Sequence, residues 1–104
     1  MLVTTTENIP GREIKEVLGI VFGCCVQTKH IGKDLRAAGR TIIGGESKSY
    51  TELVEESRRL AMQRMIDDAK KFGADAIVCM RFATAQTMGS AAEIIAFGTA
   101  VKTH

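Results

Sequence analysis

The segment EIKEVLGIVFGCCVQT, from Glu13 to Thr28, decides the fold because its side chains alternate along most of its length. Side chains of a β-strand point in turn to opposite faces of the sheet, so this alternation predicts one long strand. One predicted face carries Leu18, Ile20, Phe22, Cys24 and Val26, and the other carries Val17, Gly19, Val21, Gly23 and Cys25. The two glycines inside the strand indicate a bulge or a close neighbour.

Two helices are predicted in the middle of the chain. Apolar residues at helical spacing predict the first over Ile31 to Ile43. The second is predicted over Ser49 to Phe72, where Ser49 and Glu52 form a capping box at its start and Gly73 follows its end. Its expected apolar stripe consists of Tyr50, Leu53, Val54, Ala61, Met65, Ala69 and Phe72.

Further strands are predicted at both ends of the chain. They span Leu2 to Thr6, Asp75 to Gln86 and Ala92 to Thr103, with a hairpin loop at residues 87–90. The order β-β-α-α-β-β predicts a single α+β domain over residues 1–104, in which an antiparallel sheet carries both helices on one face.

The opposite face of this sheet is also apolar. Its predicted side chains are Val17, Val21, Cys25, Ile94, Ala96 and Ala100, with Cys79 and Arg81 on the strand predicted over Asp75 to Gln86. Because large exposed apolar patches are unusual on soluble monomers, we expect a second copy of the chain to cover this face.

The composition is that of a globular protein. The chain has 104 residues, 45% hydrophobic and 25% charged, with a formal net charge of +2 and no Trp. Such a small charge gives no reason to expect nucleic acid as a partner. The N-terminus lacks the pattern of a signal peptide, and no window is apolar enough to span a membrane. We therefore expect a cytoplasmic protein whose cysteines stay reduced, with no membrane partner.

Four separated segments resemble the YbjQ-like family, which is named for heavy-metal binding. They are TTTENIPGREIKEVLGIVFG, GGESKSYTELVEESRRLAMQRM, AKKFGADAIV and AAEIIAFGTAVK, and together they cover nearly the whole chain. The resemblance implies a dodecin-like α+β subunit that assembles into a ring-shaped homo-oligomer, a pentamer. One branch of the family has two aspartates at the positions of Arg81 and Ala83, so a hard-cation site built on them is not expected here.

The candidate metal ligands are therefore soft ones, namely Cys25, Cys79 and His30. Cys25 and Cys79 are predicted on the face away from the helices, whereas Cys24 is predicted as a core thiol beside Phe22. Thiolate and imidazole ligands favour Zn or Cu(I) over Mg or Ca. The alternative is that all three cysteines are buried and inert, since free cysteine is among the most buried residue types.

Charged side chains suggest two further sites. Lys33, Arg36 and Arg40 share one face of the first predicted helix and could bind an anion, although a solvated helix face is the more common reason for such a run. Arg81 is predicted to face a subunit boundary or the lumen of the ring. Arg64 and Asp68, spaced as an i, i+4 pair, are either a surface pair or part of the same boundary.

These observations favour a cytoplasmic homo-oligomer that binds a heavy metal. The alternative is a structural or small-anion-binding ring without catalysis. An enzyme is the least favoured interpretation, because no spacing places Ser, His and Asp as a triad and no carboxylate pair is visible.

Overall fold

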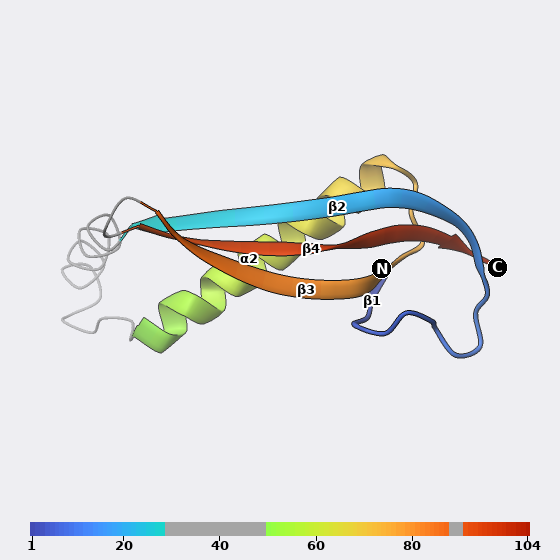
Figure 1. The fold of residues 1–104 in the computed structure, drawn as a ribbon, viewed down its shortest axis with the longest axis horizontal. Coiled ribbons are helices and arrows are strands. Elements are labelled where there is room, and N and C mark those ends of the chain that lie inside the picture. The colour runs from blue at the N-terminus through green and yellow to red at the C-terminus, as the bar shows by residue number, and fades with distance from the viewer. Residues whose placement is uncertain (29–49, 88–90) are drawn as a thin grey trace, which may run out of the picture.

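The computed structural model describes residues 1–28, 50–87 and 91–104. These residues form a four-stranded sheet with one helix across it (Figure 1). The elements are β1 (Leu2–Val3), β2 (Ile14–Thr28), α2 (Tyr50–Lys71), β3 (Ala76–Thr87) and β4 (Ala91–Thr103). The α+β class is confirmed, and each of these elements lies where the sequence predicts it. The first predicted helix and the Ser49 cap lie outside the described residues.

The sheet is mixed rather than wholly antiparallel. Its strand order is β1-β3-β4-β2, and β1 runs parallel to β3 with Leu2 opposite Ala76. The segment between β1 and β2 explains this pairing. Its Ile9 is buried against Ala76, Val78 and Val101, so the segment crosses the sheet and separates β1 from β2. The predicted antiparallel sheet is correct for β2, β4 and β3 only.

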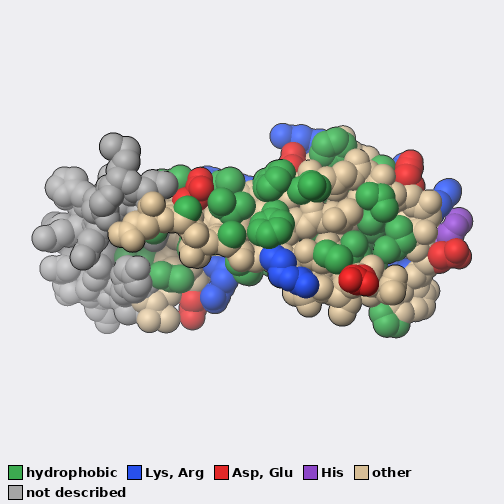
Figure 2. Space-filling model, in the orientation of Figure 1, with side chains coloured by type: hydrophobic (Ala, Val, Ile, Leu, Met, Phe, Trp, Pro, Cys, Tyr) green, Lys and Arg blue, Asp and Glu red, His purple; other side chains and the backbone are tan. Residues whose placement is uncertain are grey.

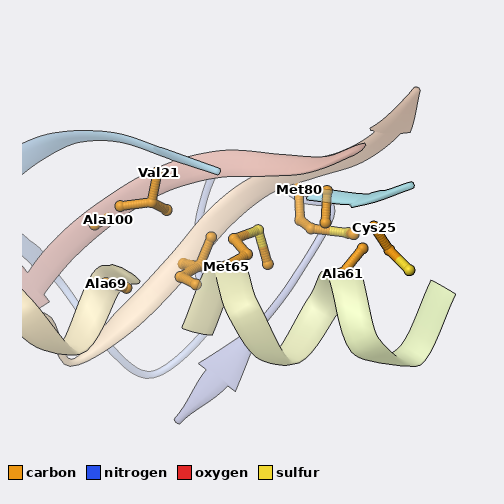
Figure 3. Close-up of a cluster of buried hydrophobic side chains, with 9 residues drawn as sticks. Val21, Cys25, Ala61, Met65, Ala69, Met80 and Ala100 are labelled. Carbon is orange, nitrogen blue, oxygen red and sulfur yellow. The ribbon is translucent and has the colours of Figure 1, made fainter. Parts of the chain in front are cut away.

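Helix α2 packs on the face of the sheet that the sequence analysis left bare. Val21 and Cys25 of β2 and Ala96 and Ala100 of β4 lie in the core beneath the helix, as Figure 3 shows for three of them. The predicted faces of β4, and of β2 from Ile20 onward, are therefore reversed, whereas Val17 and Leu18, which precede the register shift at Gly19, lie on their predicted faces. Alternation shows which side chains share a face of the strand, but it cannot show which face the helix covers when both faces are apolar, as they are here. The helix takes the face with the smaller side chains, where its backbone can come close.

The helix presents a matching row of mostly small residues. Ser57, Ala61, Met65 and Ala69 follow at a spacing of four and are all buried, and the Ser57 hydroxyl donates to the Leu53 carbonyl at 2.8 Å. The predicted stripe is confirmed at Ala61, Met65 and Ala69. It is wrong at Phe72, which follows the last residue of α2 and is 51% exposed.

Gly23 is the point where helix and sheet are closest. A Cβ atom added there would overlap the Ala61 carbonyl oxygen and the Met65 amide nitrogen, and would lie 2.9 Å from the Arg64 carbonyl carbon. These are backbone atoms of α2, which cannot move without the whole helix. Gly23 therefore lets the helix backbone rest directly on β2, the close neighbour that the sequence predicts. The other predicted feature, a bulge, occurs at Gly19, where φ is 139° and the register shifts.

We predict that Gly23→Ala lowers the free energy of unfolding by about 1–3 kcal/mol, the usual cost of overfilling a packed site. Urea unfolding at a fixed protein concentration measures the change. The control is Lys15→Ala, on the same strand but outside this contact, whose exposed side chain should matter by less than about 0.5 kcal/mol. Equal stability of the two variants would contradict the close packing of α2 on Gly23.

Candidate functional site

The outer face of the sheet, opposite α2, carries a stripe of exposed apolar side chains. The outer stripe is defined here as Val17, Ile20, Phe22, Cys24 and Val26, all on β2. Its four large members are 53% to 64% exposed. Phe22 lies beside Phe97 of β4, with ring centroids 6.5 Å apart. In Figure 2, where the strands lie in front of α2, hydrophobic side chains gather across the middle of this face. Among the described residues, the outer stripe contains four of the nine large hydrophobic side chains that are exposed.

Two side chains of α2 bind the backbone of β2 on either side of Gly23. Asp68 accepts a hydrogen bond from the Phe22 amide at 3.2 Å, and Arg64 donates one to the Cys24 carbonyl at 2.6 Å. Because β2 is an edge strand, these backbone groups point away from the sheet. Arg64 and Asp68 therefore cap the sheet edge. Their i, i+4 spacing was visible in the sequence, but their hydrogen-bond partners depend on the close approach of the α2 backbone to Gly23.

The two adjacent cysteines have opposite surroundings, which are the reverse of those predicted. Cys24 is exposed on the outer stripe, whereas Cys25 is 7% exposed and lies in the core under α2 (Figure 3). The interpretation of Cys24 as a core thiol is wrong. Cys25 is the thiol that behaves as an ordinary buried hydrophobic residue.

Cys79 occupies a β-bulge between β3 and β4. The register shifts between Val78 and Arg81, and Cys79 has φ of 56°, with its amide donating to the Thr6 carbonyl at 3.0 Å. Its half-buried side chain packs with the cluster around Ile9 on the outer face.

The structure does not bring Cys25 and Cys79 together in one chain. Cys25 pairs with Ile94, while Cys79 lies in the bulge opposite Phe97–Thr99. At ~3.4 Å per residue this is about 14 Å along β4, with the two side chains on opposite faces. His30 lies outside the described residues, as do Lys33, Arg36 and Arg40. In the described ranges, no three His, Cys, Asp or Glu side chains converge as a metal site.

Arg81 faces away from α2, as the sequence predicts. It lies opposite Phe97, and its Nη1 donates to the carbonyls of Thr5 and Met80 at 3.0 and 2.8 Å. Through the Thr5 carbonyl, Arg81 links the N-terminal segment to β3. Its side chain is exposed in the single chain and lies at the margin of the outer face.

None of the helical segments that the structure describes has the length and apolar character needed to cross a bilayer.

Comparison with known proteins identifies the family. The sequence profile of the family described as "Putative heavy-metal-binding" matches residues 1–104. A UPF0145 protein of Thermosipho africanus is 58% identical over 102 residues, covering 98% of this chain and 94% of its own length. A UPF0145 protein of Archaeoglobus fulgidus is 53% identical over 102 residues, with the same coverage of both chains.

A solved structure supports the fold alone. The crystal structure of a protein of unknown function in the DUF74 family, from Pediococcus pentosaceus, aligns with a TM-score of 0.59 at 16% identity. The alignment covers 100% of this chain and 98% of that one. The matches to the family profile and to the UPF0145 proteins extend over almost the entire sequence, and this chain belongs to the YbjQ-like family, described as "Putative heavy-metal-binding".

Proposed function

We propose that this protein acts as a homo-oligomer assembled through the outer face of its sheet, without catalytic activity of its own. The exposed outer stripe is the observation that carries the proposal. Four large apolar side chains on one strand remain more than half exposed in the single chain. Covering the rest of each contributes roughly 1 kcal/mol, about half the value of full burial. Phe97 and Ile95 of β4 lie beside the stripe and extend the surface a partner copy could cover.

The chemistry of the face also suits a second copy of the same chain. A closed ring is the arrangement that the family resemblance implies, with five copies. In the assembly, the Arg81 side chain at the margin of the face would contact groups of the neighbouring copy in place of water. The two carbonyls that it already binds would hold its guanidinium in place. Arg64 and Asp68 would act indirectly, by holding β2 in its place.

Heavy-metal binding is the second candidate, and the position of Cys24 favours it. This thiol is exposed on the outer stripe, between Phe22 and Val26. One chain offers a single thiol there, whereas a closed zinc site usually needs four ligands. Association through the outer face would supply further thiols from other copies. We therefore propose Cys24, rather than the buried Cys25 or the distant Cys79, as the ligand for a soft ion such as Zn or Cu(I).

The third candidate is a ring that binds a small anion and no metal. It would use Lys33, Arg36 and Arg40, which lie outside the described residues. We propose the cytoplasm as the location for each candidate, because thiols stay reduced there.

We predict that Phe22→Asp shifts the protein to smaller species, because it places a carboxylate in the covered face. Sedimentation velocity at micromolar concentration measures the mass. Phe72→Asp is the matched control, since Phe72 is equally exposed but lies off the sheet, and it should leave the mass unchanged. A wild-type protein that sediments as a monomer at this concentration would rule out assembly through the outer face.

We predict that metal binding requires Cys24 and an intact outer face. Titration of untagged protein with Cu(I) or Zn(II), against a chelator of known strength, should show at least about tenfold weaker binding for Cys24→Ser, because losing even a partner that only orients a ligand costs about 10- to 100-fold in metal affinity. Phe22→Asp should weaken binding as well, and Cys25→Ser should not. If Cys25→Ser alone loses the metal, the ligand is the buried thiol. If the wild type binds no metal, the anion-binding or structural ring is favoured.

A further inference from the structure

The two long edges of the sheet differ in how their backbone groups are hydrogen-bonded. The β2 edge is capped around Gly23 by Arg64 and Asp68. The β3 edge is paired only near its start, where the amides of Cys79 and Met80 donate to the carbonyls of Thr6 and Thr4. From Arg81 to Thr87, no strand within the described residues lies beside it, and residues 81–86 are all exposed. Proteins usually block such an edge unless it is used for pairing.

The pairing pattern shows which backbone groups this open edge presents. The Phe22 amide points away from β4, so Phe22 and Phe97 form a non-hydrogen-bonded pair and the next pair, Gly23 with Ala96, is hydrogen-bonded. The backbone groups of Ala96 thus point toward β2. Phe82, which lies opposite Ala96 on the other side, must therefore direct its N–H and C=O to the open edge. The same alternation applies to Thr84, opposite Ile94.

Helix α2 continues past this edge. It crosses the sheet diagonally, and its first turns lie beyond β3 in Figure 1. The gap between helix and strand is a groove of about 290 Å³ lined by Glu55, Arg58, Arg59, Met62 and Phe82. Phe82, 40% exposed, and Met62 provide apolar surface. The described residues offer no ion-pair partner to Glu55, Arg58 or Arg59. The first turns of α2 thus leave a position beyond this part of β3 that no strand among the described residues occupies.

We propose that the β3 edge of a second copy fills this position, antiparallel to the first and related to it by a twofold axis. Phe82 and Thr84 of each copy would exchange backbone hydrogen bonds with the other, and the overhanging turns of α2 would cover the added strand. The groove carries both signs of charge, so a twofold brings Glu55 of one copy toward Arg58 or Arg59 of the other. This self-complementarity favours the same chain over an unrelated peptide. The contact is separate from the one at the outer stripe.

Amide hydrogen exchange of the wild-type protein tests the proposal directly. The amides of Phe82 and Thr84 should be protected in concentrated solution and should exchange on the order of 100-fold faster on dilution, as paired edges open. Fast exchange of both amides at every concentration would overturn the proposal. Protection that persists in a monomer would also overturn it, because the edge would then be covered within the chain.

The second arm removes one edge amide in a protein that lacks the outer contact. In the Phe22→Asp background, Thr84→Pro should convert dimers to monomers, since proline cannot donate but is tolerated on an edge strand. Thr84→Val keeps the amide and should remain dimeric. Circular dichroism verifies that each variant is folded. If Phe22→Asp protein is already a monomer with fast-exchanging Phe82, the edge contact is absent even though the outer contact exists. If Phe22→Asp leaves the mass unchanged, the outer contact fails and the exchange experiment alone decides the edge.

Discussion

The contact between Gly23 and the backbone of α2 is the constraint on which the rest of this structure depends. Because position 23 has no side chain, the helix can rest on β2 with Ala61 and Met65 above the glycine. At that distance Arg64 and Asp68 reach the backbone on either side of it and cap the strand edge. One glycine therefore sets the position of the helix, the face it covers and the protection of one edge. A single added methyl group would disturb all three.

The same contact between Gly23 and α2 determines which side chains the molecule leaves exposed. With α2 on the face of small side chains, the larger Ile20, Phe22 and Val26 point outward, and Cys24 with them. The diagonal course of the helix covers β2 and β4 at one end and extends beyond β3 at the other (Figure 1). An apolar outer stripe and an open β3 edge are thus two consequences of one packing arrangement. Both offer surfaces that a further copy of the chain can cover, which is why assembly is the function that the geometry supports best.

Much of the fold could be predicted from local patterns. Alternation predicted β2 to within one residue, and the spacing and capping signals predicted α2 and the final hairpin. The faces could not be predicted, because both sides of β2 are apolar and the choice depends on the size of side chains across a packed interface. Nor could the parallel pairing of β1, which depends on Ile9 crossing the sheet. For the candidate site, adjacency showed that Cys24 and Cys25 face opposite ways, but not which one is buried. The bulge at Cys79 gave no sequence signal, since residues with positive φ are usually glycine or asparagine.

Native-state labelling of the two adjacent thiols tests the central claim most directly, because it reports which face α2 covers and whether the other face is covered in turn. A thiol reagent should modify Cys24 rapidly in dilute protein and more slowly as the concentration rises and copies associate. It should reach Cys25 only as fast as the protein unfolds. A Cys25 that reacts faster than Cys24 would show that the helix covers the opposite face, and a Cys24 rate that is independent of concentration would show that the outer stripe stays open to solvent.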